Sequence, residues 1–312
     1  MNLKRIFQGV CLSFIFLLFS GCALYGVNAF FSGLTQGINA GGALSADISG
    51  AQNNAGSEPE NNLQNSESKP PEINAEAAIS VKSNFSGEQK IIFEKNADKE
   101  LPIASLTKLM TAVVVLENYD LLKKITISEN ADSQELMETD LKIGDTFPTI
   151  DILYIMLIQS SNKAAYALTE QMGEEKFTAL MNQKALEIGL ENTFFEDATG
   201  LSPKNISTAK DLAKLAGYIL KNHFEIAEIT RTKFFPLSNL GEIKNTNELL
   251  DEIPNIVGGK TGFTRMAKGC MLLITDDLAS DGYFIHIILG ADDRFLETKK
   301  LIDFADPVRS LR

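Results

Sequence analysis

Histidine and cysteine are scarce in this sequence, which has two histidines and three cysteines among 312 residues. A zinc site takes three or four protein ligands, mostly from these two residue types, so no metal site is predicted and no cofactor is expected. His286 lies in the alternating stretch YFIHIILG and is expected on a strand face. A Ser-His-Asp catalytic triad is therefore poorly supported.

Runs of lysine or arginine are missing as well, and the formal net charge is −12. An acidic surface without basic clusters repels the phosphate backbone of nucleic acids, which argues against nucleic acid as a partner. With 44% hydrophobic and 22% charged residues, the composition is ordinary for a soluble globular protein. The length allows one or two domains.

The three cysteines do not form a disulfide framework, because each lies in a different setting. Cys11 is inside an N-terminal apolar run, Cys22 follows that run, and Cys270 stands alone in the main body of the chain. Cys270, in KGCMLLIT, is expected to be a small core residue on a strand.

Residues 1–22, MNLKRIFQGVCLSFIFLLFSGC, have the layout of a secretory signal peptide. Basic residues precede the apolar run Val10–Phe19, which is shorter than the roughly 20 residues of a membrane span. The ending FSGC resembles a bacterial lipobox, in which the cysteine, here Cys22, is lipidated and becomes the mature N-terminus. It departs from the lipobox at Phe19, where leucine is usual.

Two other interpretations of the N-terminus stay open. Ordinary signal peptidase can cleave after Ala29, or the apolar run extended to Phe31 can remain as an uncleaved anchor. All three interpretations place the body of the chain outside the cytoplasm, either tethered through its N-terminus to the outer face of the cytoplasmic membrane or secreted to the cell wall.

A long polar segment separates the N-terminus from the rest of the chain. From Thr35 to Pro71 the sequence is rich in Asn, Gly, Ser, Ala, Gln and Glu, with almost no aromatic residues. Such a composition buries too little apolar surface to become ordered. We therefore expect residues 23–74 to be a disordered tether and residues 75–312 to form one folded domain, without a C-terminal β-rich domain.

Within that domain, strands are predicted at both ends and helices between them, which favours a mixed α/β fold whose terminal strands share a sheet. The predicted strands are 77–83, 90–96, 255–264, 268–277 and 282–291. Thr149 and Thr208 are expected to cap two of the helices, with Asp151 in the first turn after Thr149 and Asp211 completing a start signal after Thr208. The predicted helices are 102–119, 149–159, 162–173, 174–190, 207–223 and 296–305.

Ser105 and Lys108 form an S-x-x-K pair at the head of the apolar helix PIASLTKLMTAVVVLENY. Residues three apart lie on one face of a helix, and the free N–H groups of a helix N-terminus favour the negative charge that develops in acyl transfer. Lysine serves as a base only when it is unprotonated, and burial or a second cation nearby lowers its pKa.

Two further groups of residues are candidates for the same site. Ser160 and Asn162, in QSSNKAA, follow a buried helix and offer a hydroxyl and an amide to a cleft. In GGKTGFT, Lys260 supplies positive charge and Thr261 a hydroxyl, while Gly262 leaves room for a substrate backbone to approach closely.

Copies of the first two patterns occur elsewhere: S-x-x-K at Ser66/Lys69 and Ser207/Lys210, and S-x-N at Ser128/Asn130. The first copy lies in the predicted tether, the second at the start of an amphipathic helix, and the third in a polar loop, so none is expected to be functional. K-T-G occurs once.

In the order S-x-x-K, S-x-N and K-T-G, the three motifs resemble the signature of the penicillin-recognising serine enzymes. Stretches such as SSNKAAYALTE, LENTFFEDATGLS, STAKDLAKLA and NTNELL extend the resemblance from about Ala75 to Ala305. They resemble the D-alanyl-D-alanine carboxypeptidases, which are low-molecular-weight penicillin-binding proteins. The resemblance implies an antiparallel sheet packed with helices, with an inserted helical subdomain, and hydrolysis of peptidoglycan stem peptides, with β-lactams as inhibitors.

The resemblance also implies a role for each motif residue. Ser105 is the acylated nucleophile, Lys108 is its base, and Ser160 relays the proton to the leaving D-alanine. The implied substrate-binding residues are Asn162 for the amide, Lys260, Thr261 and Arg294 for the terminal carboxylate, Gly262 beside the substrate backbone, and Phe263, whose N–H group completes an oxyanion hole with that of Ser105.

Several alternatives share parts of this signature. Class A β-lactamases add an E-x-x-L-N loop, and the nearest stretch here, Glu187–Glu191, lacks the asparagine. A DD-endopeptidase that cuts peptidoglycan cross-links uses the same chemistry and is the closest alternative. A non-catalytic penicillin-binding sensor is a third possibility, and glutaminases of the same fold are disfavoured by the export signal.

Overall fold

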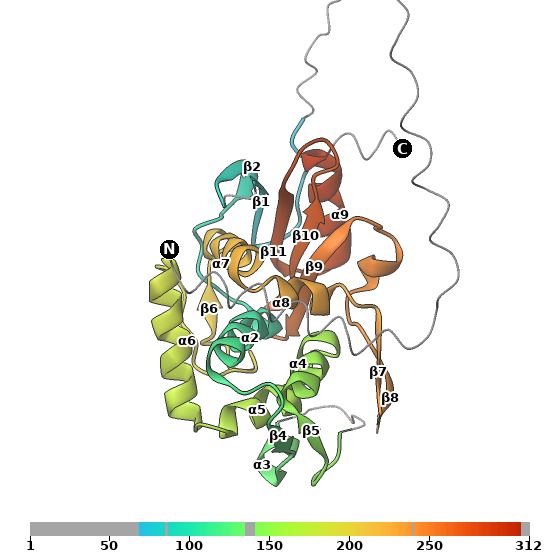
Figure 1. Cartoon of the computed structure of the whole chain (residues 1–312). Helices are drawn as coiled ribbons and strands as arrows, with labels where there is room; N and C mark the ends of the chain where they lie inside the picture. Colours follow the sequence, from blue (N-terminus) through green and yellow to red (C-terminus); the bar gives the residue numbers. More distant parts are fainter. Residues whose placement is uncertain (1–68, 85–86, 135–140, 239, 307–312) are drawn as a thin grey trace, which may run out of the picture. The chain divides into compact units, whose positions relative to one another are not determined.

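The computed structural model of the protein describes residues 69–84, 87–134, 141–238 and 240–306 (Figure 1). The predicted signal peptide, Cys22 and nearly all of the predicted tether lie outside these ranges. The last residues of that segment are described: Ile73 is buried, and the N–H of Asn74 donates to Glu297 Oε2 at 2.8 Å. The packed structure therefore includes Ile73 and Asn74, which we had assigned to the tether.

Five antiparallel strands form the main sheet, in the order β2-β1-β11-β10-β9. The N-terminal hairpin pairs with the C-terminal strands through β1 and β11, where Ala77 lies opposite Leu289. The prediction that the two ends of the domain share one sheet is confirmed. The bounds are β1 Ala77–Ser83, β2 Gln89–Lys95, β9 Ile256–Thr264, β10 Lys268–Asp276 and β11 Tyr283–Ala291.

Helices cover both faces of this sheet (Figure 1). Met271 and Leu273 of β10 pack with Leu301 of α9, Arg294–Ala305, on one face. The alternating residues Leu272 and Ile274 point to the other face and join the larger core. That face carries α7, Ala209–Asn222, and α8, Phe224–Thr230.

The remaining helices lie between the strands in sequence and form a second region below the sheet in Figure 1. At its centre, α2 has nine buried residues, Thr107 to Val115, and the apolar ones among them belong to the larger core. The elements are η1 Ala104–Leu106, α2 Thr107–Asn118, α3 Glu129–Asp132, α4 Thr149–Ile158, α5 Asn162–Glu170 and α6 Glu174–Ile188.

Three short two-stranded sheets and one 3-10 turn complete the described residues. They are β3 Leu101–Pro102 with β6 Ile206–Ser207, β4 Lys124–Thr126 with β5 Thr146–Pro148, β7 Phe234–Leu237 with β8 Gly241–Lys244, and η2 Glu248–Asp251. No helix within the described ranges combines the length and the apolar character needed to cross a membrane.

The predicted helix starts are partly right. Thr208 caps α7, since its hydroxyl accepts a hydrogen bond from the N–H of Asp211 at 3.1 Å. The prediction for Thr149 is wrong: it is the first residue of α4, and its hydroxyl donates to Lys123 O at 2.9 Å. Strand β5 runs directly into this helix, so the Thr149 hydroxyl bonds to the residue before β4 instead of capping the helix. Asp151 is in the first turn, as expected.

Two isolated residues have the structural positions expected for them. Cys270 is buried in β10, and His286 is buried in β11, where its Nδ1 lies 3.0 Å from Ser80 Oγ. The S-x-N copy at Ser128/Asn130 was expected in a loop, and this expectation is wrong. Ser128 caps the short helix α3 by accepting a hydrogen bond from the N–H of Ala131 at 2.9 Å.

Candidate active site

The nucleophile candidate lies in a tight turn in front of α2. Ala104 has a positive φ of 49°, which a non-glycine residue rarely adopts, and Ser105 follows it within η1. Lys108 is in the first turn of α2, and its Nζ donates to Ser105 Oγ at 3.1 Å. The predicted pairing is confirmed, although the serine belongs to the 3-10 turn and the lysine to the α-helix.

Lys108 is 0% exposed, and its amine has two further acceptors. Its Nζ donates to Asn162 Oδ1 at 2.7 Å, which joins the first motif to the second. It also donates to Thr199 O at 2.5 Å. Thr199 was not among the predicted site residues. It lies in the stretch DATGLS, and its contact is made by the backbone carbonyl, which no side-chain pattern reveals.

Ser160 lies between α4 and α5 with φ of 61°, a left-handed conformation that costs free energy for a residue with a side chain. Its hydroxyl accepts a hydrogen bond from Lys260 Nζ at 2.7 Å. Lys260 is 1% exposed in the edge strand β9. The second and third motifs therefore meet, and Asn162 connects them to the first.

The positive charges of the site act on one another. Burial lowers the pKa of Lys260 well below its ordinary value, and the charges of Lys108 and Arg294 lower it further. The Lys260 ammonium also donates to Thr261 O at 3.0 Å. A lowered pKa makes the Lys260 amine a better proton donor than an exposed lysine.

Gly262 allows β9 to lie against the nucleophile turn. A Cβ at this position would lie 3.1 Å from Ile103 O and 3.2 Å from the backbone N of Ser105, so a side chain would push the strand away. The next residue, Phe263, is 66% exposed. Its side chain is thus open to solvent at the edge of the site.

Thr261 and Arg294 lie on the α9 side of β9. Thr261 Oγ1 is 2.6 Å from Thr246 Oγ1, so the segment before η2 also contributes a hydroxyl. Arg294 is half-buried over the Phe295 ring, 4.6 Å from its centroid, and its Nε has no hydrogen-bond partner among the described residues. Asp293 caps α9, and Arg294 is the first residue of that helix.

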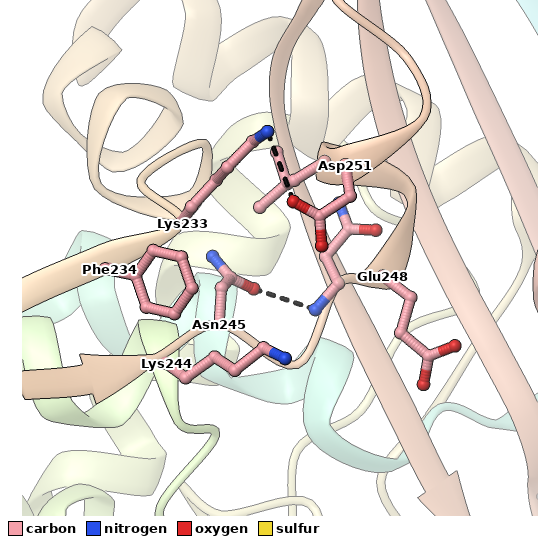
Figure 2. Close-up of a pocket in the computed structure, with 8 residues that line it drawn as sticks. Lys233, Phe234, Lys244, Asn245, Glu248 and Asp251 are labelled. Carbon is pink, nitrogen blue, oxygen red and sulfur yellow. Dashed lines mark hydrogen bonds and ion pairs between the residues drawn. The ribbon is translucent and has the colours of Figure 1, made fainter.

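A small pocket lies next to this segment, between η2 and the β7–β8 hairpin (Figure 2). It carries charges of both signs, and Lys233 Nζ is 3.2 Å from Asp251 Oδ1. Asn245 and Asn247, on either side of Thr246, contribute to its wall. The lining residues are Lys233, Phe234, Lys244, Asn245, Asn247, Glu248, Leu250 and Asp251.

The S-x-x-K copy at Ser207/Lys210 does not join the site. Ser207 is buried, and its hydroxyl lies 2.7 Å from Thr193 Oγ1, while Lys210 forms a surface ion pair with Asp98 at 2.6 Å. In the copy at Ser66/Lys69, the serine lies outside the described residues.

The comparison with protein families agrees with this geometry. Residues 64–293 match the model of a peptidase family described as D-alanyl-D-alanine carboxypeptidase. The chain belongs to this family. The predicted family resemblance is thereby confirmed.

Curated relatives bear two different names. A D-alanyl-D-alanine endopeptidase of Pseudomonas aeruginosa is 36% identical over 60% of this chain and 63% of its own length. A D-alanyl-D-alanine carboxypeptidase of Bacillus subtilis is 33% identical over 69% of this chain and 59% of its own length. The chain thus spans less than two thirds of each of these two relatives.

Solved structures in the family share the fold. A penicillin-binding protein of Listeria monocytogenes in its cefotaxime-bound form has a TM-score of 0.68 at 30% identity and covers 76% of this chain and 99% of its own. A DD-transpeptidase of Streptomyces, as a serine-to-alanine mutant, has a TM-score of 0.70 at 26% identity and covers 77% and 99%. The predicted mixed α/β, DD-peptidase-like fold is confirmed.

Proposed function

We propose that this protein is a serine DD-carboxypeptidase that removes the terminal D-alanine from peptidoglycan stem peptides through an acyl-enzyme on Ser105. The observation that carries the proposal is the buried network of two serine–lysine pairs, Ser105 with Lys108 and Ser160 with Lys260, joined through Asn162. Such a network provides a nucleophile, a base and a proton relay without a histidine.

In the proposed first step, Ser105 Oγ attacks the carbonyl carbon of the penultimate D-alanine and its proton passes to Lys108. The peptide bond then breaks, and Ser160 relays the proton that Lys108 took to the leaving amine, with Lys260 bonded to the Ser160 hydroxyl. Free D-alanine departs and the stem peptide stays as an ester on Ser105. Water hydrolyses the ester in a second step that regenerates the hydroxyl.

Binding of the substrate is assigned to β9 and its surroundings. Lys260, Thr261 and Arg294 receive the terminal carboxylate, and Asn162 holds the substrate amide. The N–H groups of Ser105 and Phe263 stabilise the oxyanion, and Gly262 lets the substrate backbone lie alongside the strand. One such oxyanion donor typically contributes about 10²–10³ in rate. β-Lactams, which carry a carboxylate beside a reactive amide, would acylate the same serine.

DD-endopeptidase activity on cross-links is the second candidate, because the Pseudomonas aeruginosa relative carries that name. We expect purified protein to release free D-alanine from pentapeptide muropeptides faster than it converts cross-linked dimers to monomers. Mass spectrometry of the products over time separates the two reactions. Faster cleavage of dimers would make the protein an endopeptidase, and cleavage of neither would favour a penicillin-binding sensor without catalysis.

We also propose an extracytoplasmic location, which rests on the signal-like residues 1–22 and on the cell-wall substrate. Lipidation at Cys22 would tether the domain to the membrane through the segment 23–74. Cys22→Ser should release the protein from the membrane fraction or leave it with an uncleaved signal, as measured by fractionation and intact-mass analysis. A mature N-terminus at Phe30 in the wild-type protein would contradict lipidation and indicate ordinary signal peptidase.

A further inference from the structure

The loop Asp197–Ser202 packs against both members of the first serine–lysine pair. Thr199 O accepts from Lys108 Nζ, and Ala198 O accepts from Thr111 Oγ1 at 2.7 Å. Gly200, with φ of 87°, lies so close to the nucleophile turn that a Cβ there would be 2.1 Å from Ala104 O. The position of this loop therefore sets the surroundings of Ser105 and Lys108.

Asp197 holds the loop in shape from within. Its Oδ1 accepts from the N–H groups of Thr199 and Gly200, at 2.6 and 2.7 Å, and from Thr199 Oγ1 at 2.7 Å. Its Oδ2 accepts from the N–H of Ser202 at 2.8 Å. Burial raises the pKa of Asp197, but these hydrogen bonds outweigh burial and leave the pKa below its ordinary value. The carboxylate is thus charged at neutral pH.

The carbonyl of Thr199 matters because of the hydrogen-bonding capacity of the amine. An unprotonated lysine amine has two N–H donors and one lone pair. Thr199 O and Asn162 Oδ1 are acceptors that cannot donate, so they take the two N–H groups. Once Lys108 has lost the proton that it donates to Ser105 Oγ at 3.1 Å, its lone pair lies in that direction and can accept from the Ser105 hydroxyl.

We propose that Asp197 is a positioning residue for acyl transfer: it fixes the Thr199 carbonyl and thereby directs the Lys108 lone pair at Ser105. The inference rests on the proposed function, because it requires Lys108 to take the Ser105 proton. Asp197 acts through Thr199 and needs no contact with the substrate.

The test measures how fast an uncharged thioester acylates the full-length wild-type protein and its Asp197 variants. Asp197→Ala should lower the acylation rate constant about 10²-fold, since a misplacement of about 1 Å costs this much. The affinity for a substrate carboxylate should not change, because Lys260 and Thr261 are held by other contacts. Asp197→Asn keeps one oxygen for three of the four donors, so it should fold and lose less activity than Asp197→Ala.

Asp277→Ala is the matched control. Asp277 is also buried in a loop, where it accepts from the N–H of Ala279 at 3.0 Å and pairs with Lys82 at 2.5 Å. It directly follows β10, six residues after Met271, the partner of Thr261, hence about 20 Å from the site at ~3.3 Å per residue. Its loss should lower the melting temperature and leave the acylation rate unchanged.

The outcomes separate the inference from the proposed function. A rate loss in Asp197→Ala that Asp197→Asn partly restores, with unchanged carboxylate affinity, supports the positioning role. If both Asp197 variants acylate at the wild-type rate below their melting temperatures, the residue is only structural and the inference is overturned. A wild-type protein that is never acylated would refute the proposed function itself.

Discussion

Ser105→Ala should abolish covalent labelling of this protein by a fluorescent penicillin. In the proposed mechanism the acyl group is carried by Ser105 Oγ, and the neighbouring hydroxyl of Ser160 is engaged by Lys260 at 2.7 Å. Loss of the nucleophile in a serine hydrolase lowers kcat on the order of 10⁶-fold. The measurements are gel fluorescence after denaturation and release of D-alanine from a pentapeptide substrate.

Ser207→Ala is the matched control, since Ser207 begins an S-x-x-K copy that lies away from the site. It removes a buried hydroxyl that contacts Thr193, so some stability is expected to be lost while labelling persists. Labelling of Ser105→Ala at the wild-type level would overturn the assignment of the nucleophile.

Lys108→Arg should lower the acylation rate about 10²–10⁴-fold, the usual contribution of a general base. A guanidinium keeps its proton in a protein, so arginine is always charged and cannot accept the proton of Ser105. An uncharged thioester is the appropriate acyl donor, because it has no carboxylate for Lys260 to bind. The acylation rates of the variants then report on the base alone. Lys210→Arg, in the surface copy that pairs with Asp98, should acylate normally.

The pH dependence of the same reaction tests the coupling between the two lysines. Lys108 lowers the pKa of Lys260, and because electrostatic coupling is mutual, Lys260 also disfavours the proton on Lys108. A base works when it is unprotonated, so a neighbouring cation extends activity to lower pH. Lys260→Gln removes this cation, and the acidic limb of the acylation rate should move to higher pH.

The role of Lys108 as base would be refuted by a specific pair of results. These are an active Lys108→Arg variant and an acidic limb that Lys260→Gln leaves in place. Another group would then have to take the proton of Ser105, and Lys108 would serve only to fill and neutralise the buried site.

Patterns that depend on neighbours in the chain were predictable from the sequence. The short apolar stretches of β1, β10 and β11 predicted strands, and Thr208 with Asp211 predicted the start of α7, because such patterns act over a few residues. The approach of Lys108 to Ser105 follows in the same way from a spacing of three residues along a helical turn.

Local patterns also failed in places where distant segments intervene. Thr149 is a residue type that often caps helices, but its hydroxyl donates to the carbonyl of Lys123, the residue before β4. The S-x-N copy at Ser128 is polar enough to suggest a loop, yet its serine caps a helix and donates to Glu170 Oε2 at 2.7 Å. In both cases a tertiary partner decides the role of the side chain.

The sequence by itself determined which chemical groups this protein has available: one K-T-G, one S-x-x-K at the head of a buried helix, and one S-x-N after another. Only the tertiary structure decided how they meet. Lys108 reaches Asn162 and Thr199 across 54 and 91 residues, and Lys260 reaches Ser160 across 100. Such contacts depend on how the sheet and helices pack. The Thr199 carbonyl, a group that every residue carries, acquires its role from position alone.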